Sequence, residues 1–416
     1  SGSGLSGIYR NGPMSGVAFY FSNNILKGSL TGTARTTYGM VVEAGSGSIY
    51  VWNNIVYGWK NGIYTDIGAF YARDGDVYFY NNTAYDSYLG FNSGKNRTIA
   101  KNNIAQDCND GFSGTFDASS DYNISDLASD APGANSKNST AVSFVDETNK
   151  DFHLSSSDTA AKNAGASNPG SGLFSDDIDG STRNGNGEGW DIGADEIATQ
   201  IYRSAAPSAT AALDNDNSHA DTLTIGSGTA TFEVVVADNV GVGDVLVVDT
   251  GGTDQTIDSA DTLLFIHGRT SETVFTVKTH TGATPSTSTT DNDTWVIYRA
   301  HTSLANAEAG TINPTLSGLG FSFNGGDRDL VANNEQWNIS AYANGTTADS
   351  TATHVSGWNT NEENYIKIYT PYASSEVGES QRHSEKWDEK RYSIVVASDA
   401  GMRLSDDLVH IEDLGV

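Results

Sequence analysis

A pair of asparagines that follows an apolar or aromatic run returns four times near the start of this 416-residue chain. The pairs stand at Asn23-Asn24, Asn53-Asn54, Asn81-Asn82 and Asn102-Asn103, at intervals of 30, 28 and 21 along the chain. Repeats of this length are typical of solenoids, in which each repeat forms one turn and buries its apolar side chains against its neighbours. The spacing therefore predicts a stack of similar turns.

A glycine followed by an apolar residue runs in phase with these pairs, at Gly7-Ile8, Gly39-Met40, Gly62-Ile63, Gly90-Phe91 and Gly111-Phe112. From the second asparagine of each pair to the next such glycine the distances are 15, 8, 8 and 8 residues. One side of each turn is thus predicted to be nearly constant in length, while the other side carries variable loops. We expect three short strands per turn: one after the glycine, one before the asparagine pair and one after it.

The second asparagines of the pairs are predicted to form a ladder along the stack, with about 4.8 Å between successive turns. Asparagine tolerates left-handed backbone angles, and its amide can donate to one neighbouring turn while it accepts from the other. The members of the predicted ladder are Asn24, Asn54, Asn82 and Asn103. The alternative is that Asn-Asn is only a frequent turn dipeptide in a chain rich in glycine and asparagine.

In these repeats the chain resembles the right-handed parallel β-helix proteins of the pectate-lyase-like superfamily, which occur on bacterial surfaces, among secreted polysaccharide-degrading enzymes and in phage spikes. The resemblance is clearest over residues 1 to about 125. It extends to residues 142–144, 151–154 and 190–196, which look like the segment that closes many such proteins after the last turn. It implies an all-β architecture, and it implies an activity only weakly because one fold hosts many functions.

Four parts are expected along the chain. Residues 1–130 are predicted to form parallel β-helix coils, 131–200 the closing segment, 201–300 a small β-sandwich or barrel domain, and 301–416 a cap helix with the first coils of a second β-helix portion. The best short helix is 303–310, with Ser303 as its N-cap. Further strands are expected at 337–342, 365–369, 392–397 and 408–414. The β-helix is therefore predicted to be split between the two ends of the chain.

Composition excludes several partners. A formal net charge of −29 argues against nucleic acid and against insertion into or adsorption on an anionic membrane, since both surfaces need a basic footprint. The single Cys108 rules out an intrachain disulfide and is expected to pack inside a turn. No apolar run approaches transmembrane length. The chain begins Ser-Gly-Ser-Gly, which we expect of a processed or excised chain, and an extracellular or cell-surface location is predicted.

Polar residues indicate candidates for two kinds of site, a calcium site and sites of N-glycosylation. Oxygen ligands cluster around glycines between Asp176 and Glu188, and the candidates for a calcium ion are Asp177, Asp179 and Glu188. Their spacing does not match an EF-hand, so an ordinary polar hairpin is the alternative, and no other cofactor is expected. Sequons for N-glycosylation stand at Asn81, Asn96, Asn123, Asn138, Asn292, Asn338 and Asn344, although a chain of this composition produces several by chance.

No catalytic residue is predicted. β-Helix lyases and hydrolases join carboxylates from neighbouring turns to a basic residue. The nearest approach here is Arg73, Asp74 and Asp76, with Asp66 and Lys60 or Lys101 as additional candidates, and a solvated corner loop is the simpler interpretation. A secreted polysaccharide-binding or polysaccharide-cleaving protein remains the alternative function. Its sugar-stacking residues would be Trp59, Tyr64, Tyr85 and Tyr88.

The leading hypothesis is that the C-terminal end of one copy of the chain pairs with the N-terminal end of another. Residues 408–414 share the strand and turn character of residues 19–26, with Asp413 in the place of Asn24. If a second copy began directly after Val416, the distance from Asp413 to the Asn24 of that copy would fall inside the spacing range found within the chain. An open β-helix end leaves backbone groups unpaired, and a heterologous contact between different ends propagates into a filament.

The predicted function is therefore that of an extracellular structural protein, a subunit or repeat of a head-to-tail surface fibre or adhesin. Its main partner would be a second copy of the chain, and surface glycans are further candidates. The residues expected at the assembly interface are Leu408, His410, Ile411, Leu414, Val416, Leu5, Ile8 and Tyr9. The alternative is a monomer in which both ends complete one permuted solenoid.

Overall fold

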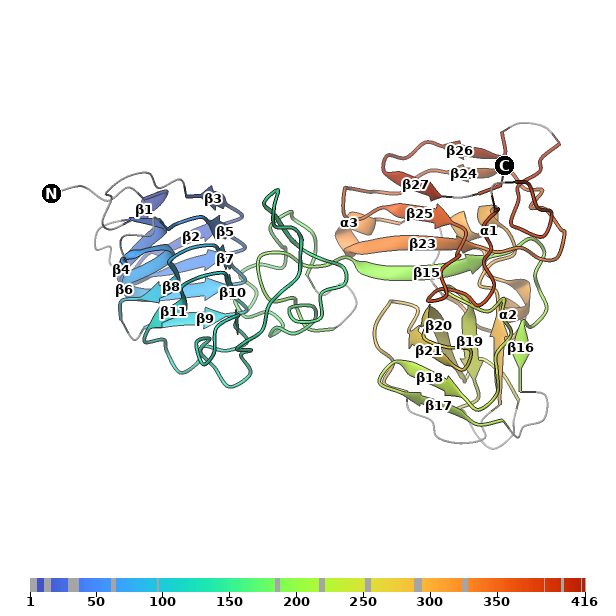
Figure 1. Ribbon diagram of the computed structural model, residues 1–416, viewed down its shortest axis with the longest axis horizontal. Helices are drawn as coiled ribbons and strands as arrows, with labels where there is room; N and C mark the ends of the chain where they lie inside the picture. Colours follow the sequence, from blue (N-terminus) through green and yellow to red (C-terminus); the bar gives the residue numbers. More distant parts are fainter. Residues whose placement is uncertain are drawn as a thin grey trace. The chain divides into compact units, whose positions relative to one another are not determined.

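The computed structural model describes residues 6–415 except 11–15, 29–36, 61–64, 96, 184–187, 217–220, 251–255, 288–293, 324–327, 385, 398–399 and 413. The chain forms two compact units, Ser1–Ile197 and Ala198–Val416. Strands dominate both units and many of them pair in parallel (Figure 1), so the all-β prediction is confirmed. Within the described part of the chain, no helix is long and apolar enough to cross a membrane.

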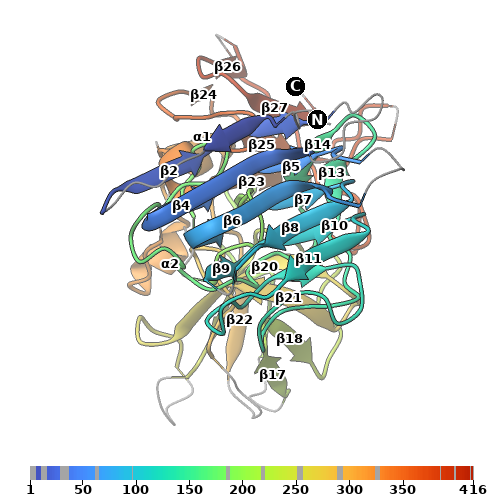
Figure 2. The same ribbon diagram turned by 90° about the vertical axis from the view of Figure 1, so that its left-hand side faces the viewer.

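The first unit contains two parallel sheets between which the chain alternates (Figure 2). One sheet has the order β1 (Ile8–Arg10), β4 (Thr37–Trp52), β6 (Ile67–Tyr80), β8 (Leu89–Ser93) and β11 (Asp110–Gly114), with β2 (Ala18–Ser22) beside β4 and β9 (Thr98–Lys101) beside β6. The other sheet has the order β3 (Ile25–Lys27), β5 (Ile55–Tyr57), β7 (Thr83–Tyr85), β10 (Ile104–Gln106) and β12 (Ile124–Ser125). Each strand therefore lies beside the corresponding strand of the next repeat.

Like side chains stack in columns between these sheets. Phe70 lies 4.8 Å from Phe91 with the ring planes 1° apart, and Phe91 lies 5.0 Å from Phe112. Offset stacking of this kind adds to the burial of apolar surface. Cys108 is buried in the same core, as expected, and burial raises the pKa of its thiol to about 12. Burial therefore favours the protonated thiol over the thiolate.

The phase of the glycine repeat differs from the prediction in one place. Met40 is in register with Phe70, which in turn is in register with Phe91, so the third repeat enters the sheet at Ala69-Phe70. The predicted pair Gly62-Ile63 lies outside the described residues. The stretch from Asn54 to this point is thus almost twice as long as predicted, because an insertion precedes β6. In β4 and β6, moreover, the two strands expected before the asparagine pair run on as one bulged strand.

The second half of the first unit has little regular structure. The strands β13 (Phe144–Asp146) and β14 (Asp151–Leu154) form an antiparallel pair at two of the three places expected for the closing segment. The third place, residues 190–196, is an irregular segment whose apolar side chains Trp190, Ile192 and Ala194 are buried. This segment packs on the asparagine turns, as described below.

The second unit contains a further parallel sheet, with the order β15 (Thr199–Ala205), β23 (Glu335–Ala341), β25 (Ile366–Tyr369) and β27 (Val409–Glu412). A second parallel pair joins β24 (Thr353–Val355) to β26 (Met402–Leu404). The predicted helix is present as α1 (Leu304–Glu308), and the Ser303 hydroxyl caps it by accepting the Asn306 N–H at 3.0 Å. Leu304 and Ala307 of α1 pack against Ile201 of β15 in one core cluster.

A seven-stranded antiparallel sheet is inserted between β15 and β23. Its order is β16 (Asp214–Asn215), β22 (Trp295–Tyr298), β19 (Val245–Val248), β20 (Thr262–Arg269), β21 (Val274–Lys278), β18 (Thr229–Phe232) and β17 (Leu223–Gly226). The short helices α2 (Pro314–Gly318) and α3 (Leu330–Asn333) follow it. The strand β15 runs across the predicted boundary at residue 201 and belongs to the parallel sheet. The strand expected at 392–397 is reduced to isolated bridges at Ser393 and Ile394.

The buried His301 gives the second unit a predicted pH dependence. Its Nδ1–H donates to the Thr311 carbonyl oxygen at 2.8 Å, and burial lowers the pKa of the imidazole to about 4. Between pH 6.5 and 4 the unfolded chain binds a proton there that the folded chain does not bind. The free energy of unfolding is therefore expected to fall by up to about 3 kcal/mol as the pH drops through this range.

Urea titrations of the full chain between pH 4 and 7 test this expectation. His301→Gln removes the histidine contribution to the pH slope, whereas His354→Gln, a change at an exposed histidine, leaves the slope as in the parent. Equal slopes for the parent and His301→Gln would contradict the assignment.

Candidate functional site

The structure brings the four predicted ladder asparagines together. In each step the backbone N–H and the side-chain Nδ2 of one asparagine both donate to the Oδ1 of the next, at distances of 2.8–3.1 Å. A fifth member, Asn123, accepts from Asn103 in the same way. It was missed because Tyr122, and not a second asparagine, precedes it, although its separation of 20 residues from Asn103 is close to the last repeat.

The ladder has a direction. Asn54, Asn82, Asn103 and Asn123 are fully buried, and each of them has its Oδ1 filled by the preceding asparagine. Asn24 is half-buried, and within the described part of the chain nothing donates to its Oδ1. The ladder is therefore complete everywhere except at the edge formed by β2 and β3.

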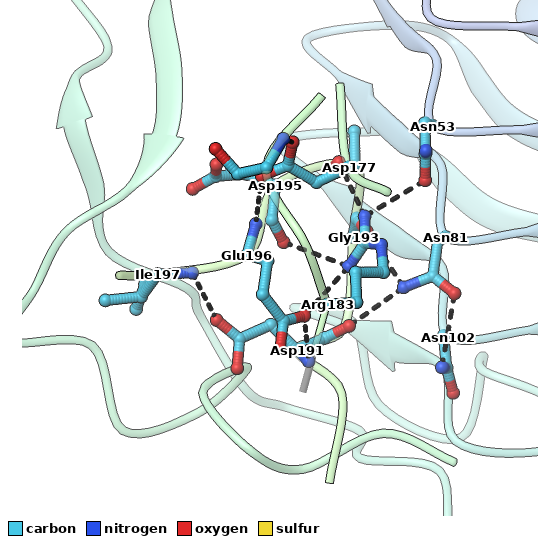
Figure 3. A network of polar contacts seen from close by, with 12 residues as sticks. Asn53, Asn81, Asn102, Asp177, Arg183, Asp191, Gly193, Asp195, Glu196 and Ile197 are labelled. Atoms are coloured by element: carbon cyan, nitrogen blue, oxygen red, sulfur yellow. Dashed lines mark hydrogen bonds and ion pairs between the residues drawn. The ribbon is translucent and has the colours of Figure 1, made fainter. Parts of the chain in front are cut away.

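The first asparagine of each pair has a different role. Asn23, Asn53, Asn81 and Asn102 adopt left-handed backbone angles with φ of 49–57°, as expected for a tight turn. Their side-chain amides donate to backbone carbonyl oxygens of the closing segment, for example from Asn53 to Asp176 at 2.8 Å. The bond from Asn81 to Asp191 at 2.9 Å is drawn in Figure 3. This column therefore fastens the closing segment to the turns.

Arg183 completes this fastening. Its side chain is fully buried and donates to Glu196 Oε2 and to Asn53 Oδ1, both at 3.0 Å, as well as to the Ala194 carbonyl oxygen at 2.6 Å (Figure 3). Charge-assisted bonds of this kind are short and directional. Sequence reasoning missed Arg183 because it lies 130 residues from Asn53, and no local pattern marks it.

The predicted calcium ligands do not converge. The Asp177 carboxylate accepts the backbone N–H groups of Asp179, Ser181 and Glu196 at 2.8–3.2 Å, and burial raises its pKa to about 6. Asp179 lies 2.9 Å from His153 Nε2, and Glu188 accepts from Asn163.

Asp177 therefore shapes the turn that it starts, which agrees with the alternative of a polar hairpin. The ligand atoms of His153, Asp179 and Asp195 do lie within 4.8 Å of one another. That grouping holds neither Asp177 nor Glu188, and calcium binding stays a prediction.

The residues considered for catalysis are separated into different pairs. Asp66 accepts the Tyr38 hydroxyl at 2.6 Å, Asp74 lies 3.9 Å from Lys95, and Asp76 pairs with Arg97. Lys60 pairs with Asp86, Arg73 donates to the Tyr9 hydroxyl at 3.0 Å, and Lys101 lies in β9. The contacts of the described residues therefore give Asp66, Asp74 and Asp76 different partners.

The aromatic residues proposed to stack on sugars are mostly interior. Trp59 and Tyr85 are each only 6% exposed, Tyr88 is half-buried, and Tyr64 lies outside the described residues. The expectation of an exposed platform is therefore wrong for Trp59 and Tyr85, because both side chains pack into core clusters of the first unit. The outward aromatic column is instead Tyr20, Tyr50 and Tyr78, whose rings stack on one another at 5.7 and 4.6 Å.

The sequons are mostly unsuited to glycans. Asn81, Asn123 and Asn338 are buried, and their side-chain nitrogens donate inside the fold, so a glycan there would require unfolding. Asn138 accepts two backbone N–H groups, at 2.6 and 2.7 Å, whereas Asn344 is exposed. Asn96 and Asn292 lie outside the described residues. Of the sequons that the structure describes, Asn344 is the exposed one, and its Nδ2 donates to the Pro207 carbonyl oxygen at 2.9 Å.

The predicted assembly residues lie at edge strands. In the second unit β27 ends its sheet, and Leu408, His410 and Ile411 are exposed there while Leu414 is half-buried. In the first unit Ile8 is half-buried and Tyr9 is 50% exposed on β1. Leu5 and Val416 lie outside the described residues. Sequence reasoning did not list Tyr20 and Ile25, which are 56% and 65% exposed at the same edge.

The comparisons with known proteins add no relative. No protein-family model matches the chain, and neither a curated protein nor a solved structure matches it.

Proposed function

We propose that the repeats of the first unit form a right-handed parallel β-helix and that the protein is a structural subunit, or repeat, of a head-to-tail fibre outside the cell. The observation that carries this proposal is the unfinished ladder. Each buried step fills the Oδ1 of an asparagine with two donors, and within the described residues the Oδ1 of Asn24 is left without either at the β2–β3 edge. A strand added beyond β2 would bring a backbone N–H to this Oδ1, as each preceding turn does within the chain.

The opposite side of the first unit supports this interpretation because it is closed. The Asp130 carboxylate accepts the Phe112 N–H at 3.1 Å and the Ser125 hydroxyl at 2.5 Å, and the Ser136 hydroxyl accepts the Asn123 N–H at 2.9 Å. Side chains thus take the place of a further strand there. The opposite edge is formed by β1, β2 and β3 and is called the β1–β3 edge. There the described residues provide no such cover, and apolar side chains such as Ile25 are exposed.

The second unit has the same asymmetry. The helix α1 packs against β15 at one side of the parallel sheet, and β27 is the open strand at the other. Open parallel edges are templates for further strands. Since the β1–β3 edge and the β27 edge differ in sequence, their pairing is heterologous and continues from copy to copy, as in a filament.

The alternative of a polysaccharide-binding or polysaccharide-cleaving protein has less support. Its expected stacking residues Trp59 and Tyr85 are buried, and its candidate carboxylates Asp66, Asp74 and Asp76 have separate partners. Stacking on sugars needs an exposed ring face, and the rings of Tyr50 and Tyr78 face each other instead.

Self-association tests the proposal. Light scattering of the purified chain is expected to give a molar mass that rises above 44.0 kDa with concentration. Ile411→Lys places a charge on the open edge and is expected to weaken association at least tenfold, or about 1.4 kcal/mol.

The matched control is Val235→Lys, a lysine at an exposed apolar residue that is 58% accessible and belongs to the loop after β18. It should associate as the parent does. A constant mass of 44.0 kDa for the parent at every concentration would refute the proposal.

A further inference from the structure

The two faces of β2 differ in what they contact. Phe19 and Phe21 pack against the core of the first unit, in register with the fully buried Ile49 and Val51. Tyr20 between them points outward and stacks on Tyr50 at 5.7 Å. Any strand that continues this sheet beyond β2 must therefore place apolar side chains opposite the two phenylalanines and a flat outward side chain opposite the tyrosine.

The strand β27 has the matching alternation. Val409 and Ile411 are in register with Ile366 and Ile368, which are buried in the core of the second unit. His410 between them is exposed, and its ring stacks at 4.1 Å on the ring of Tyr365. The outward imidazole is thus already the last member of an aromatic stack.

We infer that β27 of one copy pairs in parallel with β2 of a second copy, with Val409 opposite Phe19, His410 opposite Tyr20 and Ile411 opposite Phe21. This inference rests on the proposed function and specifies its interface. It differs by one residue from the alignment of Asp413 with Asn24 that the sequence suggested. Successive side chains of a strand point to opposite faces, so that alignment would direct Ile411 outward and His410 into the core.

The same register continues past the strand. Gly415 forms a parallel bridge with Ser393, so the chain after β27 runs on in the stack. In the inferred register Leu414 falls opposite Asn24 and Gly415 opposite Ile25, the first residue of β3. The Leu414 backbone N–H then stands where the backbone N–H of each ladder asparagine stands, in position to donate to the Asn24 Oδ1.

The charges of the two ends favour this pairing of unlike edges. Residues 1–42 carry Arg10, Lys27 and Arg35 and no acidic residue, in a chain whose formal charge is −29. Residues 404–416 carry Asp406, Asp407, Glu412 and Asp413 and neither lysine nor arginine. Opposite charge steers the two edges together and disfavours contact between two like edges. A second copy of this chain is therefore the occupant of the β2 edge.

Disulfide trapping between two singly substituted chains tests the register. Ser22→Cys on one chain and Glu412→Cys on the other lie opposite each other, at about the 4.8 Å strand spacing that a disulfide accepts. Each chain holds one engineered cysteine and the native Cys108 is buried, so a covalent dimer with one cysteine from each variant forms only between copies. The controls mix Ser22→Cys with His410→Cys or with Ile411→Cys.

The inference predicts that the pair with Glu412→Cys oxidises roughly tenfold faster than either control pair, because the control thiols are displaced along the strand or on the opposite face. Faster oxidation with Ile411→Cys or His410→Cys would overturn the register. If light scattering shows assembly but no mixture crosslinks, the β2–β27 contact is wrong, whereas the proposed fibre is not contradicted. If a chain with both Ser22→Cys and Glu412→Cys forms only an intramolecular disulfide, the occupant of the β2 edge is the chain's own β27 and not that of a second copy.

Discussion

Replacing Asn82 by alanine is expected to lower the free energy of unfolding of the first unit by about 3–5 kcal/mol. The side chain is fully buried, and its Nδ2 donates to the carbonyl oxygens of Val51 and Tyr80 and to Asn103 Oδ1 at 2.9–3.0 Å. Its Oδ1 also accepts both donors of Asn54. The change therefore leaves several buried polar groups unpaired, each at a cost of about 1–3 kcal/mol.

The matched control is Asn24→Ala at the open end of the same ladder. Asn24 is half-buried, and no described residue depends on its Oδ1, so its loss is expected to cost about 1 kcal/mol. Denaturant titrations of the full chain under conditions where it is monomeric compare the two variants. Equal losses for Asn82→Ala and Asn24→Ala would mean that the ladder does not stabilise the stack.

Replacing Arg183 by methionine is expected to cost about 3–5 kcal/mol as well. The guanidinium is the partner of the buried Glu196 at 3.0 Å and also bonds to Asn53 and to the carbonyl oxygens of Gly193 and Ala194. Removal of one member of a buried ion pair leaves the other charge without compensation. The closing segment should then detach locally from the asparagine turns.

Limited proteolysis measures the local detachment of the closing segment, and denaturant titration measures the loss of stability. Arg183→Met should speed cleavage between residues 158 and 197, and the double variant Arg183→Met/Glu196→Gln should recover part of the lost stability because it no longer buries a lone carboxylate. Arg97→Met is the control, since Arg97 forms an exposed pair with Asp76. Unchanged proteolysis for Arg183→Met would show that the network does not hold the segment.

The ladder could be predicted from the sequence because each turn repeats the same requirement. A left-handed residue must precede a residue whose amide both donates and accepts, and Asn-Asn satisfies the two needs at once. The fifth step shows the limit of this signal. Tyr122 adopts φ of 56° in place of the first asparagine, so the pair disappears from the sequence while the geometry persists.

Other features of the structure could not be predicted from short sequence patterns. The insertion before β6 moved the start of the third repeat to Ala69-Phe70, and Gly62-Ile63 resembled the expected pattern nearby. Trp59 and Tyr85 were expected outside, but the direction of an aromatic side chain near a turn is decided by packing that no local pattern shows. Arg183 acts across 130 residues, and such a contact leaves no trace in the spacing of neighbouring residues.

The place of β15 in the parallel sheet had no local signal either. Strand β15 is separated from its partner β23 by the entire antiparallel sheet, although the two strands are in register along their whole length. A strand whose neighbour lies so far away in the sequence cannot be assigned to a sheet by local pattern, whereas the local capping signal at Ser303 was sufficient to predict α1.

Cryo-electron microscopy of the assembled protein, at a resolution that separates strands, shows whether copies join head to tail. We expect filaments in which every subunit points the same way and β27 of one copy is followed by β2 of the next at about 4.8 Å, so that the parallel stack continues through the junction. A junction with two-fold symmetry that pairs like edges, or particles that remain single copies at every concentration, would contradict it.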